Sequence, residues 1–351
     1  MAFDLIRIND LRNLTNCEIA PHTGLNLIKG ENGSGKTSLL EAIYILGRGR
    51  SFRDKQISNA VQRGKSSFTV FGKKGSNFNK SAIGVSCSKK GTNLSIDGEK
   101  ISKLSLLAKE TPIHIVTPKS QELIEDGSSV RRRFLDWGVF HVEPLYQQFS
   151  FRYQRALSQR NKSLRESWKT ANIWNKELHE SGSKIQEYRE IYFERLKEQL
   201  LIQMEMLEVK YDLEVAFYQG WPKEQTIKKM LDDGMAGDKN RKFTRMGPHR
   251  ADINFKIKSD KFNKWGSRGH LKLVVFALFF AQANVIKSMT NKETILLVDD
   301  LTAELDEKNV ERVIAHMINQ KNQTFFTTTD YRLCIERNVG KMFHVEHGVV
   351  S

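Results

Sequence analysis

Apolar and polar residues alternate along the first part of the chain, a pattern typical of strands with one buried face. Over residues 1–29 the alternation is broken by turn signals near Asn9–Asp10 and Pro21–His22, and it predicts two strands. Residues 25–29 form a short apolar run that predicts a buried strand, and residues 38–46 carry apolar side chains at helical spacing. The polar stretch between these last two segments is therefore expected to be a loop that joins a strand to a helix.

Further short strands are predicted after this helix. Residues 68–71, 82–86 and 93–96 are separated by turns rich in glycine, asparagine and lysine, as in an antiparallel meander. Residues 112–118 predict one more buried strand. We therefore expect a first α/β lobe over residues 1–128 that contains an antiparallel β subdomain.

The pattern changes near Val130, where glycine becomes scarce and helix-forming residues dominate to about residue 210. Apolar residues then recur every seven positions, at Leu157, Leu164, Ala171, Leu178 and Ile185. This spacing predicts a pair of long packed helices. The sequence Ser181-Gly182-Ser183 weakens the register and argues against a continuous coiled coil. We expect a mostly helical arm over residues 129–250.

The last third of the chain returns to mixed structure. Residues 211–218 and 252–257 have strand character, and from Leu271 onward helices and buried strands are predicted to alternate. The apolar run over residues 273–286 is too short to span a bilayer and predicts a buried helix. Residues 251–351 are therefore expected to complete the first lobe.

Composition indicates the class of partner through its charge. The 351 residues carry a net charge of +15, which suits a polyanion such as nucleic acid, with an anionic membrane surface as the alternative. The three cysteines, Cys17, Cys87 and Cys334, are far apart and have no metal-binding spacing, so we expect a reduced compartment and no metal cage. The first residues are charged too early for a signal peptide, which favours a cytoplasmic location.

The predicted strand–loop–helix carries a phosphate-binding motif, because residues 30–37 fit G-x-x-x-x-G-K-[ST] at every constrained position. Loop amides and the helix N-terminus bind phosphate oxygens, the lysine reaches the β- and γ-phosphates, and the last hydroxyl can ligate Mg²⁺. The expected nucleotide-binding residues are Gly30, Glu31, Asn32, Gly33, Ser34, Gly35, Lys36, Thr37 and Ser38.

A second part of the site is predicted where the apolar strand over residues 294–298 ends in Asp299 and Asp300. A nucleotide site of this kind needs an aspartate for Mg²⁺, and we assign Asp299 to the metal together with Thr37. Asp300 is then placed to orient or deprotonate the attacking water. The alternative is that Asp300 is only a solvated charge at the strand end.

A third part is predicted at residues 265–273, where a turn of small residues opens an apolar helix. Its amides, Ser267 and Gly269 offer a second phosphate site. Since one helix N-terminus already serves the phosphates, this second one is most simply explained if it binds the nucleotide of another subunit.

These residues resemble known motifs. Ser-Arg-Gly at 267–269 resembles the signature of ABC-type ATPases, and Asp299-Asp300 followed by Glu304-Leu305-Asp306 resembles their Walker B motif and D-loop. Within that superfamily the chain resembles the RecF family from Phe3 to about Val345. The stretches that carry this resemblance are residues 47–53, 131–137 and 247–252.

The resemblance implies an ABC-type head, with a mixed sheet and an antiparallel subdomain, plus a helical arm. It implies binding of ATP and Mg²⁺, ATP-dependent dimerisation, and binding to single- and double-stranded DNA at gaps. It also implies weak DNA-stimulated ATP hydrolysis, cooperation with RecO and RecR in loading RecA, and roles in repair and the SOS response.

Three positions depart from the ABC pattern. His270 stands where the signature usually has glutamine, and Asp300 replaces the usual glutamate, as it does in the RecF family. Residues 323–329 offer hydroxyls but no switch histidine, and Gln121 is the candidate for the Q-loop. These features are consistent with a switch rather than a fast motor.

Several basic residues are candidates for DNA contact, each with a structural alternative. One group comprises Arg48, Arg50 and Arg53. These arginines could contact DNA backbone phosphates, and the alternative is that they contact the nucleotide base or lie in a solvated loop. Some of Arg131, Arg132 and Arg133 are expected to pair with carboxylates such as Asp136. The arm's basic residues form a face that is more often only solvated: Arg152, Arg155, Arg160, Lys162 and Arg165. We expect His249 to be a packed loop residue and Arg250 to reach the nucleotide or the partner lobe.

Other function classes share part of this pattern. A transporter ATPase subunit has the same head motifs, but the helical arm and the charge of +15 are unexpected there. A small-molecule P-loop kinase needs neither the signature helix nor Glu-Leu-Asp after the aspartates. A long-armed chromosome-organising ATPase requires a much longer helical segment.

Overall fold

The computed structural model describes residues 2–75, 81–125, 127–257, 260–261, 268–303, 305–328 and 340–351. The chain forms two compact units. The first comprises Met1–Ser120, Arg268–Phe279 and Asn291–Ser351, and the second comprises Gln121–Ser267 and Phe280–Thr290. Each unit is described by itself below.

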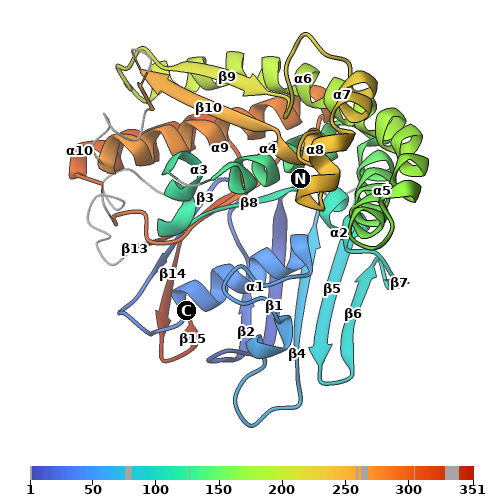
Figure 1. The fold of residues 1–351 in the computed structure, drawn as a ribbon. Coiled ribbons are helices and arrows are strands. Elements are labelled where there is room, and N and C mark those ends of the chain that lie inside the picture. The colour runs from blue at the N-terminus through green and yellow to red at the C-terminus, as the bar shows by residue number, and fades with distance from the viewer. Residues whose placement is uncertain are drawn as a thin grey trace. The chain divides into compact units, whose positions relative to one another are not determined.

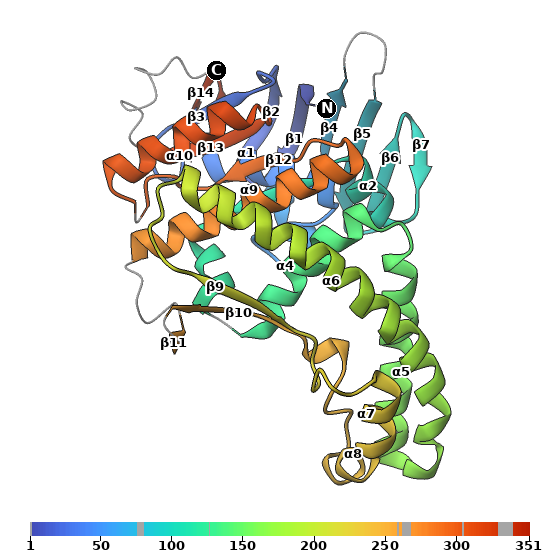
Figure 2. The same cartoon turned by 90° about the horizontal axis from the view of Figure 1, so that it is seen from above.

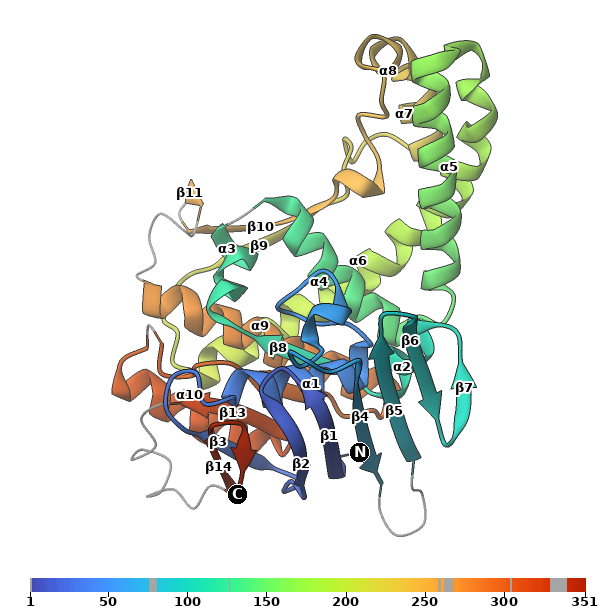
Figure 3. The ribbon, with the colours of Figure 1, turned by 90° about the horizontal axis from the view of Figure 1, so that it is seen from below.

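An antiparallel sheet makes up one layer of the first unit, and Figure 3 shows its strands side by side in the order β2-β1-β4-β5-β6-β7. Its strands are β1 (Phe3–Leu11), β2 (Leu14–Ile19), β4 (Ser67–Lys74), β5 (Ser81–Ser88), β6 (Gly91–Ile96) and β7 (Glu99–Ile101). From β4 to β7 each strand pairs with the next, which confirms the predicted meander.

Three strands precede the glycine-rich loop, so the prediction of two was wrong. The chain reverses between β1 and β2 over only Arg12 and Asn13, and Leu11 pairs with Leu14. Arg12 adopts the left-handed conformation with φ of 54°. The sequence hides this turn because neither residue of the pair is glycine or proline.

A second sheet of the first unit is mainly parallel and carries the predicted buried strands. Its order is β15-β14-β3-β13-β12-β8. The strands are β3 (Leu25–Lys29), β8 (Ile113–Val116), β12 (Ile295–Val298), β13 (Thr324–Thr328), β14 (Lys341–Glu346) and β15 (Val349–Val350). All the residues of β12 and β13 are buried, as expected for a parallel sheet covered on both faces. The terminal hairpin β14–β15 was not predicted.

Helix α1 (Lys36–Arg48) packs against both sheets and lies across the antiparallel strands in Figure 1. Leu39, Ile43 and Leu46 are completely buried in the core that it shares with β1, β4 and β13. The other helical elements that lie wholly or partly in this unit, apart from α9, are η1 (Ile57–Ala60), α2 (Leu104–Glu110), η2 (Pro118–Gln121) and α10 (Glu307–Gln320). This core fixes the position of the loop that precedes α1.

Helix α9 (Arg268–Thr290) contains the long apolar run and contributes to both units. By length and composition it is the one helix of the described residues that is apolar enough to cross a membrane, but 72% of its most apolar window is buried inside the protein. The core helix of a folded domain has the same properties, in agreement with the prediction of a buried helix.

The second unit is mostly helical and contains the predicted pair of long helices, α5 (Tyr146–Glu166) and α6 (Asn175–Met206), which run side by side in Figure 2. Its other elements are α3 (Glu122–Glu125), α4 (Ser128–Val142), η3 (Trp168–Trp174), β9 (Glu214–Tyr218), α7 (Ile227–Asp233), α8 (Met235–Arg241), η4 (Pro248–Arg250), β10 (Asp252–Ile257) and β11 (Asp260–Lys261). The 3-10 turn η3 separates the two long helices.

Of the heptad positions predicted from the sequence, Leu157 and Leu164 lie on α5, Ala171 on η3, and Leu178 and Ile185 on α6. Leu157 is half-buried. Leu164, Ala171, Leu178 and Ile185 are buried. Helix α6 continues through Gly182, where an added Cβ would lie 2.5 Å from Ile227 and 3.2 Å from Tyr153. Glycine therefore permits a close approach here and does not break the helix.

One prediction about basic residues in this unit was wrong. Arg160 is fully buried, and its guanidinium donates to Asp238 at 2.8 Å and to Thr244 at 2.6 Å, so it is not on a solvated face. The prediction that some of the arginines at 131–133 pair with carboxylates is confirmed by Arg131, which pairs with Asp252 at 2.7 Å, whereas Asp136 pairs with Arg189 at 2.8 Å.

Candidate nucleotide-binding site

The glycine-rich loop lies between β3 and α1, and two glycines are required by its backbone. Gly30 and Gly35 have φ values of 155° and 124°. A Cβ on Gly30 would lie 2.2 Å from the carbonyl oxygen of Val345, and Gly35 is the N-cap of α1 without a capping side chain. The first amides of α1 are therefore available to bind an anion at the positive end of the helix dipole.

The phosphate loop is stabilised by hydrogen bonds from residues that are distant in the sequence. The side-chain amide of Asn13 donates to the carbonyl of Ser34 at 2.9 Å, and the backbone N–H of Gly348 donates to the same oxygen at 2.9 Å. Because two separate segments fix this carbonyl, the loop keeps its shape without a ligand.

Lys36 lies over the loop and donates from Nζ to the carbonyls of Gly30 at 2.7 Å and Glu31 at 2.8 Å. Burial lowers the pKa of Lys36, and the nearby carboxylates of Asp300 and Asp299 oppose this effect. The ammonium group is thus held at the phosphate loop by acceptors that it can exchange for phosphate oxygens.

The predicted metal ligands are in direct contact. Oγ1 of Thr37 donates to Oδ1 of Asp299 at 3.0 Å, and Oγ1 of Thr327 donates to the same oxygen at 3.1 Å. Burial raises the pKa of Asp299, although both hydroxyls oppose this rise. The raised pKa indicates that the half-buried carboxylate would gain from a cation.

Asp300 lies beside this cluster and is exposed. Its backbone N–H donates to Thr327 at 2.7 Å, and its carboxylate accepts from Thr302 at 3.4 Å. Its φ of 56° places it in the left-handed region, which turns the chain directly after the half-buried Asp299. The two aspartates consequently have different environments, Asp299 being half-buried and Asp300 open to solvent.

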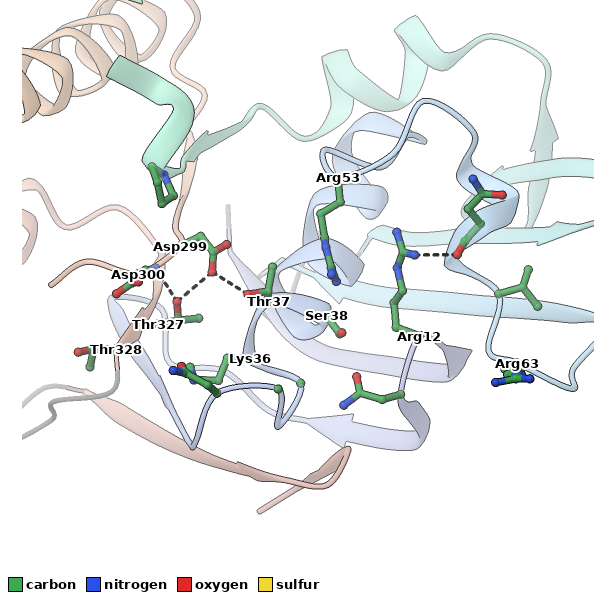
Figure 4. Close-up of a pocket in the computed structure, with 17 residues that line it drawn as sticks. Arg12, Lys36, Thr37, Ser38, Arg53, Arg63, Asp299, Asp300, Thr327 and Thr328 are labelled. Carbon is green, nitrogen blue, oxygen red and sulfur yellow. Dashed lines mark hydrogen bonds between the residues drawn. The ribbon is translucent and has the colours of Figure 1, made fainter. Parts of the chain in front are cut away.

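A pocket of about 660 Å³ collects these groups and is drawn in Figure 4. Among the predicted residues, the following line it: Asn32, Gly33, Gly35, Lys36, Thr37, Ser38, Asp299 and Asp300. It is also lined by residues that were not assigned to the nucleotide site: Arg12, Asn13, Asn59, Val61, Arg63, Pro118, Thr327 and Thr328. The positive end of the pocket, around Arg12, Arg53 and Arg63, suits a polyanionic ligand.

Arg12 is the most informative of the residues that sequence reasoning missed. It donates through Nε and Nη2 to the two oxygens of Glu41 at 2.9 and 2.8 Å. Glu41 is completely buried and also accepts from Ser51 at 2.5 Å. Hydrogen bonding to Glu41 raises the pKa of Arg12. A carboxylate in the apolar sequence Leu39-Leu40-Glu41-Ala42-Ile43 was the available signal, because a buried charge needs a partner.

The other basic candidates differ in their surroundings. Arg53 lines the pocket and lies 3.4 Å from Glu41, Arg48 lies over the ring of Tyr44, and Arg50 is exposed. In the second unit Arg131 pairs with Asp252 at 2.7 Å, and Arg152 pairs with Glu177 and Glu180. Arg132 donates to the carbonyl of Ala251.

His249 is a packed loop residue, as predicted. Its ring nitrogens lie 2.8 Å from the hydroxyl of Tyr153 and 3.0 Å from the carbonyl of Thr244. Burial lowers its pKa to about 4. Arg250 is exposed and lies over the ring of Phe243.

Among the other predicted residues that the structure describes, five do not line this pocket: Gly30, Glu31, Ser34, Gly269 and Gln121. Gly269 is partly buried in the first turn of α9 and does not line the pocket. Ser267 and Glu304 lie outside the described residues. Gln121 belongs to the second unit.

Comparison with known proteins agrees with the motifs. A family model described as the RecF/RecN/SMC N terminal domain matches residues 3–351. The chain is 35% identical to the DNA replication and repair protein RecF of Shewanella piezotolerans, with 100% of this chain and 99% of the relative covered. It is 36% identical to the protein of the same name from Shewanella sediminis, with the same coverage.

Solved structures show the same fold. The recombination mediator protein RecF with ATP, from the RecFOR pathway, aligns with a TM-score of 0.87 at 25% identity and covers 100% of this chain and 97% of its own. An SmcHead bound to the C-winged helix domain of ScpA aligns with a TM-score of 0.61 at 16% identity, covering 100% of this chain and 96% of its own. These likenesses confirm an ATPase head of the ABC and SMC type with a helical lobe.

Proposed function

Because this chain belongs to the family of RecF, RecN and SMC N-terminal domains, and RecF proteins match it over its full length, we propose that it is an ATP-dependent DNA-binding protein of replication and recombinational repair. The observation that carries the proposal is the contact of Thr37 with Asp299, which joins the phosphate loop to the predicted metal ligand. The family match does not favour the alternative of a transporter subunit.

ATP binding begins with the phosphate loop. The amides from Gly30 to Ser38 surround the phosphates, and Lys36 exchanges the carbonyls of Gly30 and Glu31 for β- and γ-phosphate oxygens. Support comes from the uncapped start of α1 and the position of Lys36 at the loop. Arg12 and Arg53 add positive charge at the other end of the pocket.

Thr37 and Asp299 hold Mg²⁺. Hydroxyl and carboxylate oxygens are the hard ligands that this ion prefers, and the half-buried Asp299 has a pKa raised by desolvation, which a bound cation would lower. The ion, when bound, neutralises charge between the β- and γ-phosphates. Thr327 holds the Asp299 carboxylate in place through its hydroxyl.

Asp300 orients the attacking water, or removes its proton, from the exposed side of the pocket. Its carboxylate is shorter than the glutamate usual in ABC-type ATPases, so we expect weak, DNA-stimulated hydrolysis that serves as a switch. Gly269 and Ser267 of a second copy complete the site, which makes ATP binding the driving force for a homodimer. Support for this part is that Gly269 does not line the pocket of its own chain.

DNA is the polyanionic partner that the charge of +15 favours. Arg50 is exposed shortly after α1 and contacts DNA backbone phosphates. Arg53 lines the pocket and contacts the nucleotide instead. Single- and double-stranded DNA at gaps is the substrate, RecR and RecO are direct partners, RecA is loaded indirectly, and the location is cytoplasmic. We also propose that the functional lobes are residues 1–128, the helical arm 129–250, and residues 251–351, which complete the first lobe.

Light scattering with and without ATP and Mg²⁺ tests the switch. We expect a shift from monomer to dimer at saturating ATP, and an unchanged monomer would contradict the proposal. Lys36→Met is expected to impair ATP binding. Ser267→Ala is expected to spare ATP binding but to weaken dimerisation and hydrolysis, and a variant that kept both would remove the role of the second copy.

A further inference from the structure

A groove in the second unit, far in sequence from the nucleotide motifs, has the properties of a protein-binding site. One part of it, about 340 Å³, lies between α6 and four consecutive residues of β9, Glu214 to Phe217. An adjoining hollow of about 380 Å³ shares Glu190 and Gln219 with it and extends to Trp221 and Ile227. Figure 2 shows α6 running past β9.

Strand β9 lies at the edge of its sheet. The order is β11-β10-β9, and among the residues that the structure describes β9 pairs with β10 alone, along the register from Glu214 to Tyr218. Exposed edges are usually protected by lysine, proline or a bulge, because they offer unpaired backbone groups to another strand. The edge sequence Glu-Val-Ala-Phe-Tyr has none of these devices.

The second hollow is lined by Gln186, a side chain with an unsatisfied acceptor. Gln186 is 7% exposed, and its Nε2 donates to Glu190 at 2.6 Å and to Gln219 at 3.2 Å. Its Oε1 is buried without a hydrogen-bond partner. A buried acceptor of this kind costs free energy until a donor reaches it.

The charge of the groove is opposite to that of the chain. Carboxylates from Glu187, Glu190, Glu194 and Glu214 line the two hollows, against two ammonium groups, Lys197 and Lys223. In a chain with a net charge of +15 this cluster repels nucleic acid and attracts a cationic segment. Apolar side chains lie next to it, including Phe193 and Phe217 with ring centroids 5.5 Å apart.

We propose that this groove binds an extended, basic segment of a partner protein, which pairs as an additional strand with the free edge of β9. Backbone hydrogen bonds to β9 supply affinity, and the glutamates on α6 select lysine or arginine at alternate positions. The apolar side chains between them enter the hollow beside Phe217. The site is separate from the nucleotide pocket and extends the proposed function to a protein partner.

A labelled peptide of about ten residues that alternates lysine and valine is the probe, with the full chain and fluorescence anisotropy as the readout. We expect saturable binding that Glu190→Lys/Glu194→Lys weakens at least about tenfold. Glu198→Lys/Glu205→Lys, an exposed double reversal on the same helix outside the groove, has the same net charge and should leave affinity within about twofold. Equal losses in both variants would overturn the proposal.

Strand pairing has its own test, which leaves the protein unchanged. N-methylation of alternate peptide nitrogens removes backbone donors and is expected to abolish binding, and the β9 amides should gain protection from hydrogen exchange with the unmodified peptide. Binding of the methylated peptide with full affinity would contradict strand addition. Two other results would overturn the proposal. A nucleotide-independent dimer that Glu194→Lys dissociates would identify a second copy of the chain as the occupant of the groove. Competition between DNA and the peptide would identify DNA as the occupant.

Discussion

The hydroxyl of Thr37 donates to Oδ1 of Asp299 at 3.0 Å although the two residues are 262 positions apart in the chain. The contact brings the first turn of α1, the helix that follows β3, to the end of β12, and β13 lies between β3 and β12 in the sheet. Thr327 on β13 donates to the same carboxylate oxygen, so three segments meet at one atom. Substitutions of Asp299 are therefore expected to affect metal binding and protein stability in opposite directions.

Asp299→Asn removes a carboxylate whose pKa is raised by burial. Because the charged form is penalised in the ligand-free protein, the variant is expected to raise Tm by about 1–3 °C. It should at the same time lower Mg²⁺-dependent ATP affinity by about tenfold or more, since a metal ligand is lost. Calorimetric titration with and without Mg²⁺ measures the second effect, and Asp300→Asn, which alters an exposed carboxylate, is the matched control.

The raised pKa of Asp299 also predicts a pH dependence. A proton binds to the folded state more readily than to the unfolded chain, so this group stabilises the ligand-free protein as pH falls through its folded pKa. The same proton competes with Mg²⁺. Metal-dependent ATP affinity is therefore expected to fall on acidification in the wild type, and an identical fall in Asp299→Asn would assign the effect to another group.

Arg12→Met is expected to lower the free energy of unfolding by about 2–4 kcal/mol, because it leaves the fully buried Glu41 without its bidentate partner. The double variant Arg12→Met/Glu41→Leu should recover most of this loss, since no buried charge remains. Urea denaturation of the four members of the cycle gives the coupling. Arg63→Met, at an exposed position in the same pocket, is expected to change stability by less than about 0.5 kcal/mol.

Arg50 and Arg53 are expected to have different roles although they are three positions apart. Arg50→Ala should reduce the slope of log DNA affinity against log salt by about 1 and leave ATP affinity unchanged. Arg53→Ala should weaken ATP binding, because Arg53 lines the pocket. Measurements of DNA and ATP binding on both variants test this, and a loss of ATP affinity in Arg50→Ala would exclude the division.

Gly182→Ala is expected to destabilise the helix pair α5–α6 by about 1–3 kcal/mol, even though alanine favours helices more than glycine does. The added methyl group would lie 2.5 Å from Ile227. Thermal unfolding measures the loss. Ser183→Ala on the same turn changes propensity without this clash, and a destabilisation of equal size there would refute the packing argument.

Acid sensitivity is expected from His249, whose folded pKa is lowered to about 4 against an ordinary value of 6.5. Its contribution is complete above pH 6.5 and is lost as pH falls toward 4, because the unfolded state then binds the additional proton. His249→Asn should flatten the fall of unfolding free energy over this range. Part of the pH dependence should persist in this variant, because burial also lowers the pKa of His316 to about 4. As a control, His344→Asn at an exposed position should leave the pH dependence of unfolding free energy as in the wild type.

Sequence reasoning succeeded where the chemistry is local. The phosphate loop from Gly30 to Thr37 lies between a strand and a helix in consecutive sequence, and Asp299 follows an apolar strand directly. The alternation over 252–257 and the heptads of α5 and α6 likewise gave the elements, because periodicity depends on neighbouring residues alone.

It failed where partners are distant. The burial of Arg160 depends on Asp238 and Thr244, which are 78 and 84 positions away, and no local pattern distinguishes it from solvated arginines such as Arg155. The pairing of Arg12 with Glu41 requires the tight turn after β1. From the sequence, Thr327 was only one of several hydroxyl residues in a segment that has no switch histidine. In the structure its hydroxyl donates to the Asp299 carboxylate.

The contact of Gly348 with Ser34 has a consequence for biosynthesis. The carbonyl that fixes the phosphate loop accepts from Gly348, and Val345 lies against Gly30. During translation the loop leaves the ribosome more than three hundred residues before these partners do. The nascent chain therefore carries a complete phosphate motif that Asn13 supports but Gly348 does not yet support, and the second contact forms only after the β14–β15 hairpin has been made.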